Sequence, residues 1–422
     1  MRDTRSVSRT ILWLCLGWSL LPGWADAQSV SPGKPGAGQT VVLVALDGFH
    51  PDYLSRKPSH NLRHLAEEGV RARWMIPVFP TLTFPNFYSI ATGLYPEHHG
   101  IVSNTIKDTA LGRFTLRDTA AARDPRWWAG EPIWVTAEKQ EKRAATFFWP
   151  GSDVAIAGVR PTYYKEYDGS VPNAERVRQV LEWLALPADS APDLVTLYLS
   201  DVDQAGHDFG PSSPETDSAI ARVDRAVGAL LQGLQKLGLD RRVNVVVVSD
   251  HGMAELRPGQ VIYLDDYVDT ATVDVVDLGP VLSLNGRWGN EAEAYRRLRG
   301  AHPHLTVYRK SEVPEQYHYR AHHRIPGIIG VADEGWMVTT RAQAASRGGR
   351  GFPRGHHGYP PELPSMRALF IARGPAFDRG AVVEPFQNIH IYSLVVKILG
   401  LRPAATDGVL DSIKSVLAET SD

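Results

Sequence analysis

The chain has 422 residues, of which 43% are hydrophobic and 22% charged, and this composition excludes a disordered, collagen-like, coiled-coil or disulfide-rich protein. Its 45 Lys and Arg residues face 47 Asp and Glu residues, which leaves a formal net charge of −2. A protein without a broad positive field is not expected to hold a nucleic-acid polymer or an anionic membrane by counterion release. A polyanionic substrate must therefore be bound at a local site.

The first 27 residues have the parts of a secretory signal peptide. Arg2, Arg5 and Arg9 form a basic start, residues 11–22 are apolar, and residues 25–27 (ADA) are a small-x-small cleavage signal. The apolar stretch is short for a bilayer span, and a retained N-terminal anchor is the alternative interpretation. Residues 28–39 are rich in Gly, Pro and Ser and are expected to form a flexible leader.

The single cysteine, Cys15, lies inside the apolar stretch, so the mature chain would contain no thiol and no disulfide. No later segment reaches the roughly 18 uninterrupted apolar residues of a transmembrane helix. We therefore expect a soluble, exported mature chain. Because extracellular animal proteins commonly carry disulfides, a bacterial periplasm fits this chain better.

Apolar, β-branched runs alternate with helical patterns from Thr40 onward. This alternation predicts an α/β fold whose central sheet is mostly parallel and covered by helices on both faces. Residues 40–422 are expected to form one domain with a small mixed or antiparallel insertion around residues 255–350. The expected elements are strand 41–46, helix 62–68, helix 86–92, strand 144–148, helix 174–184, strand 194–199, helix 215–237, strand 243–248, strand 366–372 and helix 389–400.

Carboxylates follow three of the predicted strands. Asp47 comes after the first strand, Asp201 and Asp203 after strand 194–199, and Asp250 after strand 243–248. A single Asp in such a place is most often a helix cap or turn former. Because the carboxyl ends of parallel strands form the ligand crevice of an open α/β sheet, we expect these acids to converge on one rim, where they need a cation.

Histidines accompany these acids. His207 follows Asp203 by four residues, His251 directly follows Asp250, and His356 and His357 form a glycine-flanked pair far along the chain. Carboxylate and imidazole without thiolate suit Zn²⁺, with Mn²⁺ or Fe as alternatives, whereas Ca²⁺ is disfavoured by so much imidazole. A His-His pair alone is weak evidence, and its value comes from the other clusters.

Thr83 lies just ahead of a predicted helix, where an N-cap belongs, and Pro85 falls in the first turn. The free N–H groups and positive end of that helix favour an anion. Without a metal, Thr83 would be a plain cap. Beside a metal, its hydroxyl becomes an activated nucleophile that faces a phosphate.

With these residues in view, the chain resembles the nucleotide pyrophosphatase/phosphodiesterase family of the alkaline phosphatase superfamily. The resemblance runs from residue 40 to about residue 408 and implies an alkaline phosphatase-like fold. Several motifs in the same order are far more specific than any one of them. The matching motifs are residues 46–48 (LDG), 80–86 (PTLTFPN), 92–100 (TGLYPEHHG), 203–207 (DQAGH), 249–253 (SDHGM) and 357–359 (HGY).

The resemblance implies two Zn²⁺ ions per chain. His357 is preferred over His356 as a ligand because the family pattern places its ligand directly before Gly, and Asp201 is expected to support the neighbouring ligand Asp203. The implied ligands are Asp47, Asp250, His251 and the Thr83 oxygen for one ion, and Asp203, His207 and His357 for the other.

The resemblance also implies an exported phosphodiesterase that releases nucleoside 5′-monophosphates from nucleotide diesters or pyrophosphates. Thr83 would attack phosphorus to give a covalent threonine intermediate, which metal-activated water would hydrolyse. Asn104 would hydrogen-bond a non-bridging phosphate oxygen, although an ordinary turn Asn is the alternative. Phe84 and Tyr167 would sandwich a nucleobase, although each ring is otherwise explained by simple packing.

Other functions on the same core are a choline- or lysophospholipid-type phosphodiesterase and a phosphomonoesterase. The sequence shows no strong motif for an Arg on the terminal phosphate oxygens, as a monoesterase would need, and no sulfatase nucleophile motif. A non-catalytic metal- or nucleotide-binding protein is the remote alternative. The expected partner is a small nucleotide or phosphodiester substrate, and the sequence assigns no oligomeric state.

Overall fold

The computed structural model describes residues 39–116, 118–348 and 351–419. The expected signal peptide (1–27) and all but the last residue of the expected leader (28–39) lie outside these residues. Among the described helices, none combines the length and the apolar character that a bilayer crossing requires.

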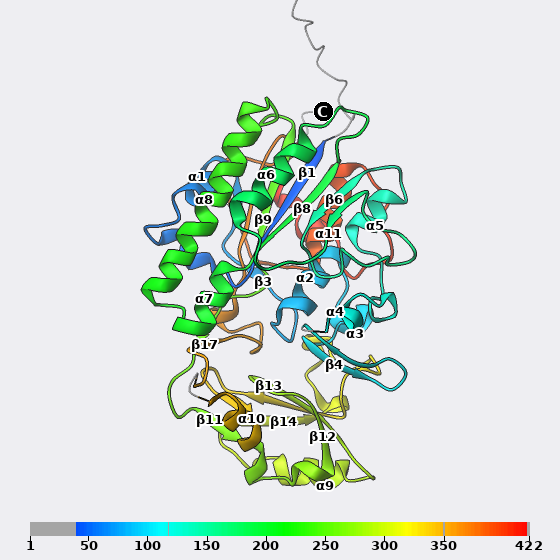
Figure 1. Cartoon of the computed structure of the whole chain (residues 1–422), viewed down its shortest axis with the longest axis vertical. Coiled ribbons are helices and arrows are strands. Elements are labelled where there is room, and N and C mark those ends of the chain that lie inside the picture. The colour runs from blue at the N-terminus through cyan, green and yellow to red at the C-terminus, as the bar shows by residue number, and fades with distance from the viewer. Residues whose placement is uncertain (1–38, 117, 349–350, 420–422) are drawn as a thin grey trace, which may run out of the picture. The chain divides into compact units, whose positions relative to one another are not determined.

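An eight-stranded sheet forms the centre of the fold (Figure 1). Strands β9, β1, β8, β6 and β7 run parallel, and β18 is antiparallel to both of its neighbours. The expected mostly parallel α/β sheet is therefore confirmed. The strand order is β19 (Ala381–Val383), β2 (Val70–Ala72), β18 (Phe370–Arg373), β9 (Val243–Val248), β1 (Thr40–Leu46), β8 (Leu194–Leu199), β6 (Ala144–Phe147) and β7 (Tyr163–Lys165).

The three central strands are buried on both faces, as their continuous apolar runs require. Leu46 of β1 is level with Leu199 of β8, and Ala45 is level with Val248 of β9. The strands therefore end at the same edge of the sheet. Whatever follows them in the sequence is brought to that edge together.

Helices cover the sheet in two groups that pack on opposite faces (Figure 1). The long helix α8 packs against α1, α6 and α7, while α11 packs against α2 and α5. Ser213 caps α8 by accepting a hydrogen bond from the Thr216 N–H. These helices are α1 (His60–Glu68), α6 (Asn173–Leu184), α7 (Asp201–Phe209), α8 (Pro214–Lys236), α2 (Thr83–Thr92), α5 (Ile133–Glu138) and α11 (His390–Leu399).

Several elements differ from the expectation, and two of the differences bear on how the site is placed. The strand expected at 366–372 begins only at Phe370, because residues Pro364–Met366 form a 3₁₀ turn. Helix α7 had no counterpart among the expected elements, since its nine residues contain Gly206 and four acidic or basic side chains. This helix decides how Asp203 and His207 face the site.

A second sheet of four antiparallel strands lies within the stretch expected to be an insertion. Helix α9 (Glu291–Leu298) packs on it, and the sheet has a separate apolar core that includes Leu282, Leu284 and Leu298. The hairpin β4 (Thr105–Asp108) and β5 (Gly112–Thr115) contacts its first strand. The strand order is β12 (Val273–Asp277), β13 (Val281–Gly286), β15 (Ile328–Ala332) and β14 (Leu305–Arg309).

Short elements complete the described chain. They are α3 (Pro96–His99), α4 (Thr119–Ala122), α10 (Arg341–Ser346), β3 (Met75–Ile76), β10 (Ala254–Glu255), β11 (Val261–Tyr263), β16 (Met337–Thr339), β17 (Gly355–His356) and β20 (Phe386–Gln387). The pair β10 and β17 brings the loop after β9 next to the loop that carries the His356-His357 pair.

Candidate metal centre

The acids that follow the central strands meet at one edge of the sheet, as expected. Asp47 and Asp250 are buried, and the Gly48 N–H donates a hydrogen bond to Asp250 Oδ1 at 3.1 Å. Gly48 has a positive φ of 69°, and a Cβ there would lie 2.9 Å from the Cα of Asp203. Only glycine lets the chain after β1 approach Asp203 this closely.

A first cluster joins Asp203 and His207 with His357. Asp203 and His207 are four residues apart on α7 and share one face of it, with His207 Nε2 3.4 Å from Asp203 Oδ1. His357 Nε2 lies 3.4 Å from the same oxygen and 3.1 Å from His207 Nε2. These three ligand atoms lie close enough to surround one cation.

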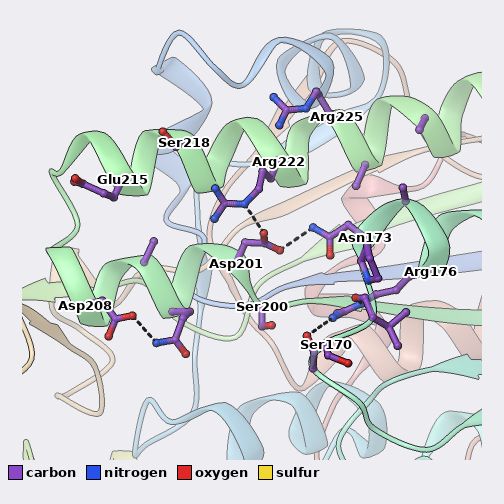
Figure 2. Close-up of a pocket in the computed structure, with 18 of the residues that line it drawn as sticks. Ser170, Asn173, Arg176, Ser200, Asp201, Asp208, Glu215, Ser218, Arg222 and Arg225 are labelled. Atoms are coloured by element: carbon purple, nitrogen blue, oxygen red, sulfur yellow. Dashed lines mark hydrogen bonds and ion pairs between the residues drawn. The ribbon is translucent and has the colours of Figure 1, made fainter.

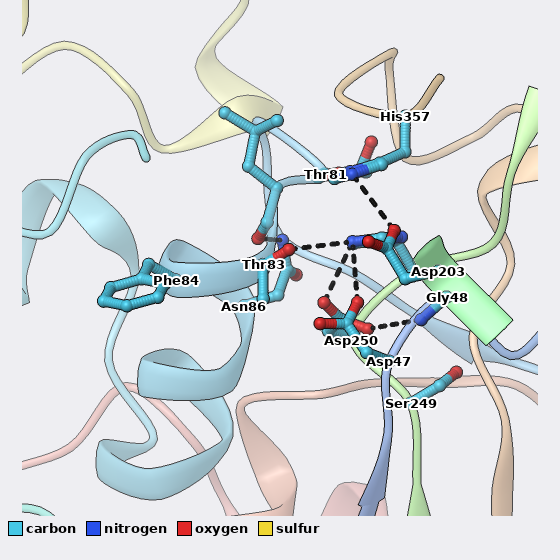
Figure 3. A network of polar contacts seen from close by, with 12 residues as sticks. Asp47, Gly48, Thr81, Thr83, Phe84, Asn86, Asp203, Ser249, Asp250 and His357 are labelled. Carbon is cyan, nitrogen blue, oxygen red and sulfur yellow. Dashed lines mark hydrogen bonds and ion pairs between the residues drawn. The ribbon is translucent and has the colours of Figure 1, made fainter. Parts of the chain in front are cut away.

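A second cluster, in which Asp47, Thr83 and Asp250 lie close together (Figure 3), surrounds His251. Its Nε2 lies 2.9 Å from Asp250 Oδ2, 3.6 Å from Asp47 Oδ1 and 3.4 Å from Thr83 Oγ1. Ligand atoms of Asp47, Asp203 and His251 all lie within 4.8 Å of one another. Asp203 therefore takes part in both clusters, which the sequence did not predict.

Backbone carbonyls orient all three imidazoles in the same way. Because a carbonyl oxygen only accepts, each Nδ1 must carry the proton, and in the neutral ring Nε2 then presents its lone pair to the carboxylates. This is the tautomer that binds metals through Nε2. The Nδ1 atoms of His207, His251 and His357 lie 2.9, 2.8 and 2.9 Å from the carbonyl oxygens of Gly355, Gly252 and Thr81.

The donor set fits a divalent cation. Asp47 Oδ1, Asp203 Oδ1 and Asp250 Oδ2 are buried and have no hydrogen-bond partner among the described residues. Burial and the negative charges of Asp250 and Asp203 raise the pKa of Asp47 well above its ordinary value. Burial and the neighbouring imidazoles hold the pKa of His357 well below its ordinary value. Carboxylate oxygens facing neutral imidazole nitrogens are the ligands that Zn²⁺ prefers when thiolates are absent.

Thr83 faces the second cluster, but it is not the cap of its helix. The cap position belongs to Leu82, and Thr83 is the first residue of α2, with Pro85 in the first turn as expected. The expectation that Thr83 occupies the N-cap position is therefore wrong by one residue. Its hydroxyl has no capping bond and instead approaches His251. At the start of this helix the Phe84 N–H donates to Asn104 and Pro85 has no N–H, so the expected set of free N–H groups is reduced to that of Thr83 among the first three residues.

Asn104 lies beside Thr83, at the end of the segment that precedes β4. Its Oδ1 accepts a hydrogen bond from the Phe84 N–H at 3.0 Å. Because that backbone group only donates, the oxygen of the Asn104 amide must point toward it. The NH₂ group of Asn104 is then left to donate elsewhere.

The two aromatic residues expected to stack on a base lie in different surroundings. The Phe84 ring packs against Phe114 and Trp128, with centroids 5.8 and 6.0 Å away. The Tyr167 ring is 58% exposed and packs against Phe148 and Tyr198. Phe84 and Tyr167 make no ring contact with each other in the described part of the chain. A base held between them stays a prediction.

Tyr198 joins the site although the sequence analysis did not single it out. Its hydroxyl donates to Asp47 Oδ2, which leaves Asp47 Oδ1 for the cluster. Tyr198 pairs with Ala45 across β8 and β1, two residues before Asp47. The register of β1 and β8 is what places Tyr198 at the site, and this register cannot be inferred from the sequence alone.

Among the described residues, the Asp201 carboxylate bonds to side chains that are not metal-ligand candidates, so the expected support of Asp203 is not found. Its two carboxylate oxygens accept hydrogen bonds from Asn173 Nδ2 and Arg222 Nε, both at 2.7 Å. The three residues line a cavity of about 980 Å³ between α6, α7 and α8 (Figure 2). Tyr167 also lines this cavity, and its ring packs on Tyr198, whose hydroxyl donates to Asp47.

His356 stays outside both clusters. Its ring lies at 89° to that of His207, with centroids 5.2 Å apart, and its Nδ1 lies 2.8 Å from the oxygen and 3.0 Å from the nitrogen of the His357 backbone. Neither group of close ligand atoms includes it. The structure thus brings His357, and not its neighbour, to the metal centre.

Comparison with known proteins gives a consistent result. A family model described as type I phosphodiesterase / nucleotide pyrophosphatase matches residues 41–360. An uncharacterized pyrophosphatase/phosphodiesterase of Schizosaccharomyces pombe is 39% identical over 88% of this chain and 79% of its own length. Mouse ectonucleotide pyrophosphatase/phosphodiesterase family member 1 is 39% identical over 89% of this chain, which spans only 42% of that relative.

A solved structure is also similar over nearly the whole described chain. Murine ectonucleotide pyrophosphatase/phosphodiesterase 5, in an inactive threonine-to-alanine form in complex with AMP, superposes with a TM-score of 0.85 at 36% identity. The match covers 90% of this chain and 100% of the other. The similarity therefore extends to the fold as well as the sequence.

Proposed function

Because this chain belongs to the type I phosphodiesterase/nucleotide pyrophosphatase family, we propose that it is a two-zinc hydrolase of nucleotide phosphodiester or pyrophosphate bonds. The products would be nucleoside 5′-monophosphates. One observation carries the proposal: three unpartnered carboxylate oxygens and three Nε2 atoms gather beside the Thr83 hydroxyl at the end of the sheet.

We propose that Asp47, Asp250, His251 and Thr83 Oγ1 hold one ion, and that Asp203, His207 and His357 hold the other. Bound zinc ions would lower the pKa of the Thr83 hydroxyl and offset the negative charge of the phosphate and leaving oxygens. Asp203 Oδ1 approaches ligands of both clusters, so it would also fix the two sites relative to each other.

Thr83 then acts as the nucleophile. After loss of its proton, its oxygen bonds to phosphorus while the bond from phosphorus to the leaving oxygen breaks, which gives a phosphothreonine diester. Water attacks this diester in a second displacement, which restores Thr83 and releases the monophosphate. The NH₂ group of the Asn104 amide donates to a non-bridging oxygen in both steps.

Nucleotide preference is proposed to come from Phe84 and Tyr167. Phe84 directly follows the nucleophile, and the half-exposed ring of Tyr167 rests on Tyr198, which in turn holds Asp47. Each is therefore close to the reacting phosphate without being a ligand. The AMP complex of the murine relative supports a nucleoside monophosphate product.

The test compares three substrates with the zinc-loaded protein: an aryl ester of a nucleoside 5′-monophosphate, a choline phosphodiester and an aryl phosphate. The proposal expects the nucleotide ester to give the highest kcat/KM. A faster choline diester would favour a lipid-type phosphodiesterase, and a faster aryl phosphate would favour a monoesterase. Zinc binding without turnover of any substrate would leave only a binding protein.

We also propose that the chain is exported to a bacterial periplasm. The basic, apolar and small-residue segments of 1–27 support export, and the absence of cysteine after residue 15 fits that compartment. The relatives include an ectonucleotide enzyme and a venom phosphodiesterase. N-terminal sequencing of protein recovered from a periplasmic extract should begin at Gln28.

A further inference from the structure

The segment that carries Asn104 is hydrogen-bonded to a residue of the antiparallel sheet. Ser103, directly before Asn104, is buried, and its hydroxyl donates a hydrogen bond to Asp277 Oδ2 at 2.6 Å. The two residues are 174 positions apart in the chain. Neither residue is a ligand of the metal clusters, and the sequence motifs do not include Asp277.

A bulge aims Asp277 at Ser103. The pairing of β12 with β13 shifts register between Val275 and Asp277, and such a shift turns the following side chain out of the regular alternation. The other carboxylate oxygen, Oδ1, accepts the Leu278 N–H at 2.9 Å. Both oxygens of the carboxylate are therefore occupied, and its orientation is fixed.

The bond from Ser103 to Asp277 is one of several contacts between this region and residues 274–319, which include most of strand β12 of the antiparallel sheet. The Tyr319 hydroxyl donates to the Val102 carbonyl at 2.8 Å, and Arg113 Nη2 donates to the Val276 carbonyl at 2.9 Å. Lys107 pairs with Asp274 at the surface. The Ser103 bond differs from these because it joins two side chains, one of them the buried Ser103, directly beside Asn104.

We propose that Asp277 is a positioning residue, which holds the Asn104 amide at the reacting phosphate through Ser103. This inference rests on the proposed function, in which Asn104 donates to a phosphate oxygen. The Phe84 N–H fixes which way the Asn104 amide faces, and Asp277 fixes where its backbone lies. An amide displaced by about 1 Å costs roughly 10²-fold in rate, so a remote anchor of this kind affects turnover.

The first test measures kcat, KM and zinc content of Asp277→Ala and Ser103→Ala with a nucleotide aryl ester. We expect kcat to fall by about 10- to 100-fold, with two zinc ions still bound and KM little changed. Asp277→Asn should recover most of the rate, because its amide accepts the Leu278 N–H and donates to the Ser103 hydroxyl. Asp274→Ala, which removes the surface pair with Lys107, is the matched control and should leave kcat within about twofold.

The second test repeats Asp277→Ala in an Asn104→Ala background. If Asp277 acts through Asn104, the added substitution should change kcat by less than about twofold, because coupled residues are not additive. A full additional 10- to 100-fold loss would overturn the inference, as would wild-type rates in Asp277→Ala. If Asp277→Ala does not fold, Ser103→Ala takes its place in the same cycle. Absence of diester hydrolysis in the unmodified chain would instead defeat the proposed function.

Discussion

The imidazole rings of His251 and His357 lie face to face, with centroids 3.5 Å and planes 13° apart. The two rings come from different clusters, and each donates its Nδ1–H to a backbone carbonyl on the outer side. Their Nε2 atoms face different carboxylates: that of His251 lies near Asp250 and Asp47, and that of His357 lies near Asp203. The stacked rings thus place the two candidate metal sites next to each other at one edge of the sheet.

Replacement of His357 should separate its role from that of His356. We expect His357→Ala to lose affinity for one metal equivalent. It should slow substrates with poor leaving groups most, because the ion of the first cluster is proposed to stabilise the leaving oxygen. His356→Ala is the matched control and should keep both ions. Zinc titration of the metal-free protein measures this directly. Loss of an ion in His356→Ala but not in His357→Ala would contradict the ligand assignment.

Thr83→Ala should abolish turnover while both zinc ions stay bound, because Asp47, Asp250 and His251 remain to hold the nearer ion. Thr83→Ser should keep part of the activity, since it retains a hydroxyl in the same place. Rates with a nucleotide aryl ester and metal analysis of the purified variants check both parts. Rates like those of the unmodified chain in Thr83→Ala would show that no threonine nucleophile is needed.

Tyr167→Ala should weaken nucleotide substrates selectively. Loss of a base contact worth about 1–3 kcal/mol predicts a fall of about 5- to 150-fold in kcat/KM for a nucleotide ester. An aryl methyl phosphodiester has no base and should be nearly unaffected. An equal fall for both substrates would mean that Tyr167 supports Tyr198 and Asp47 instead of binding a base.

Asp277 should make the stability of the chain depend on pH. Burial raises the pKa of Asp277 from an ordinary 3.8 to about 6. The hydrogen bonds from Ser103 and Leu278 and the charge of Arg113 lower this pKa, but their effect is smaller than that of burial. Between about pH 4 and 6 the unfolded chain binds fewer protons at this site, so its contribution to stability falls as pH rises.

Asp277→Asn removes this ionisation. Relative to the unmodified chain, the variant should gain about 2 kcal/mol in free energy of unfolding between pH 4 and pH 8. Urea denaturation of both proteins at the two pH values gives the difference, and Asp274→Asn, at a partly exposed position of the same strand, is the control. A difference that does not change with pH would contradict the burial of an ionised Asp277.

The central sheet was predictable because its signal is local. The valine run of β9 and the apolar runs of β1 and β8 are long enough to be buried strands, and their ends in Asp47 and Asp250 are read directly from the chain. Their convergence follows from the geometry of parallel strands. The same reasoning places Asp203 near them, but not His357, which only its family motif indicated.

The other contacts of the site depend on strand register and on a bulge, which the local sequence does not reveal. The bond from Ser103 to Asp277 depends on a bulge in a short strand, and that of Tyr198 to Asp47 depends on the register of two strands. The cap position was misplaced because Thr83 has the right chemistry for a cap, while the backbone puts Leu82 there. In this chain the hydroxyl is turned to the metal centre instead.

The stereochemical course at phosphorus tests the proposed mechanism most directly. A phosphorothioate diester of a nucleoside, chiral at phosphorus, would be hydrolysed by the zinc-loaded protein in ¹⁸O-labelled water and its product configuration determined. Two in-line displacements, first by Thr83 and then by water, predict overall retention. Inversion would mean a single attack by water, and it would contradict the covalent threonine intermediate on which the account rests.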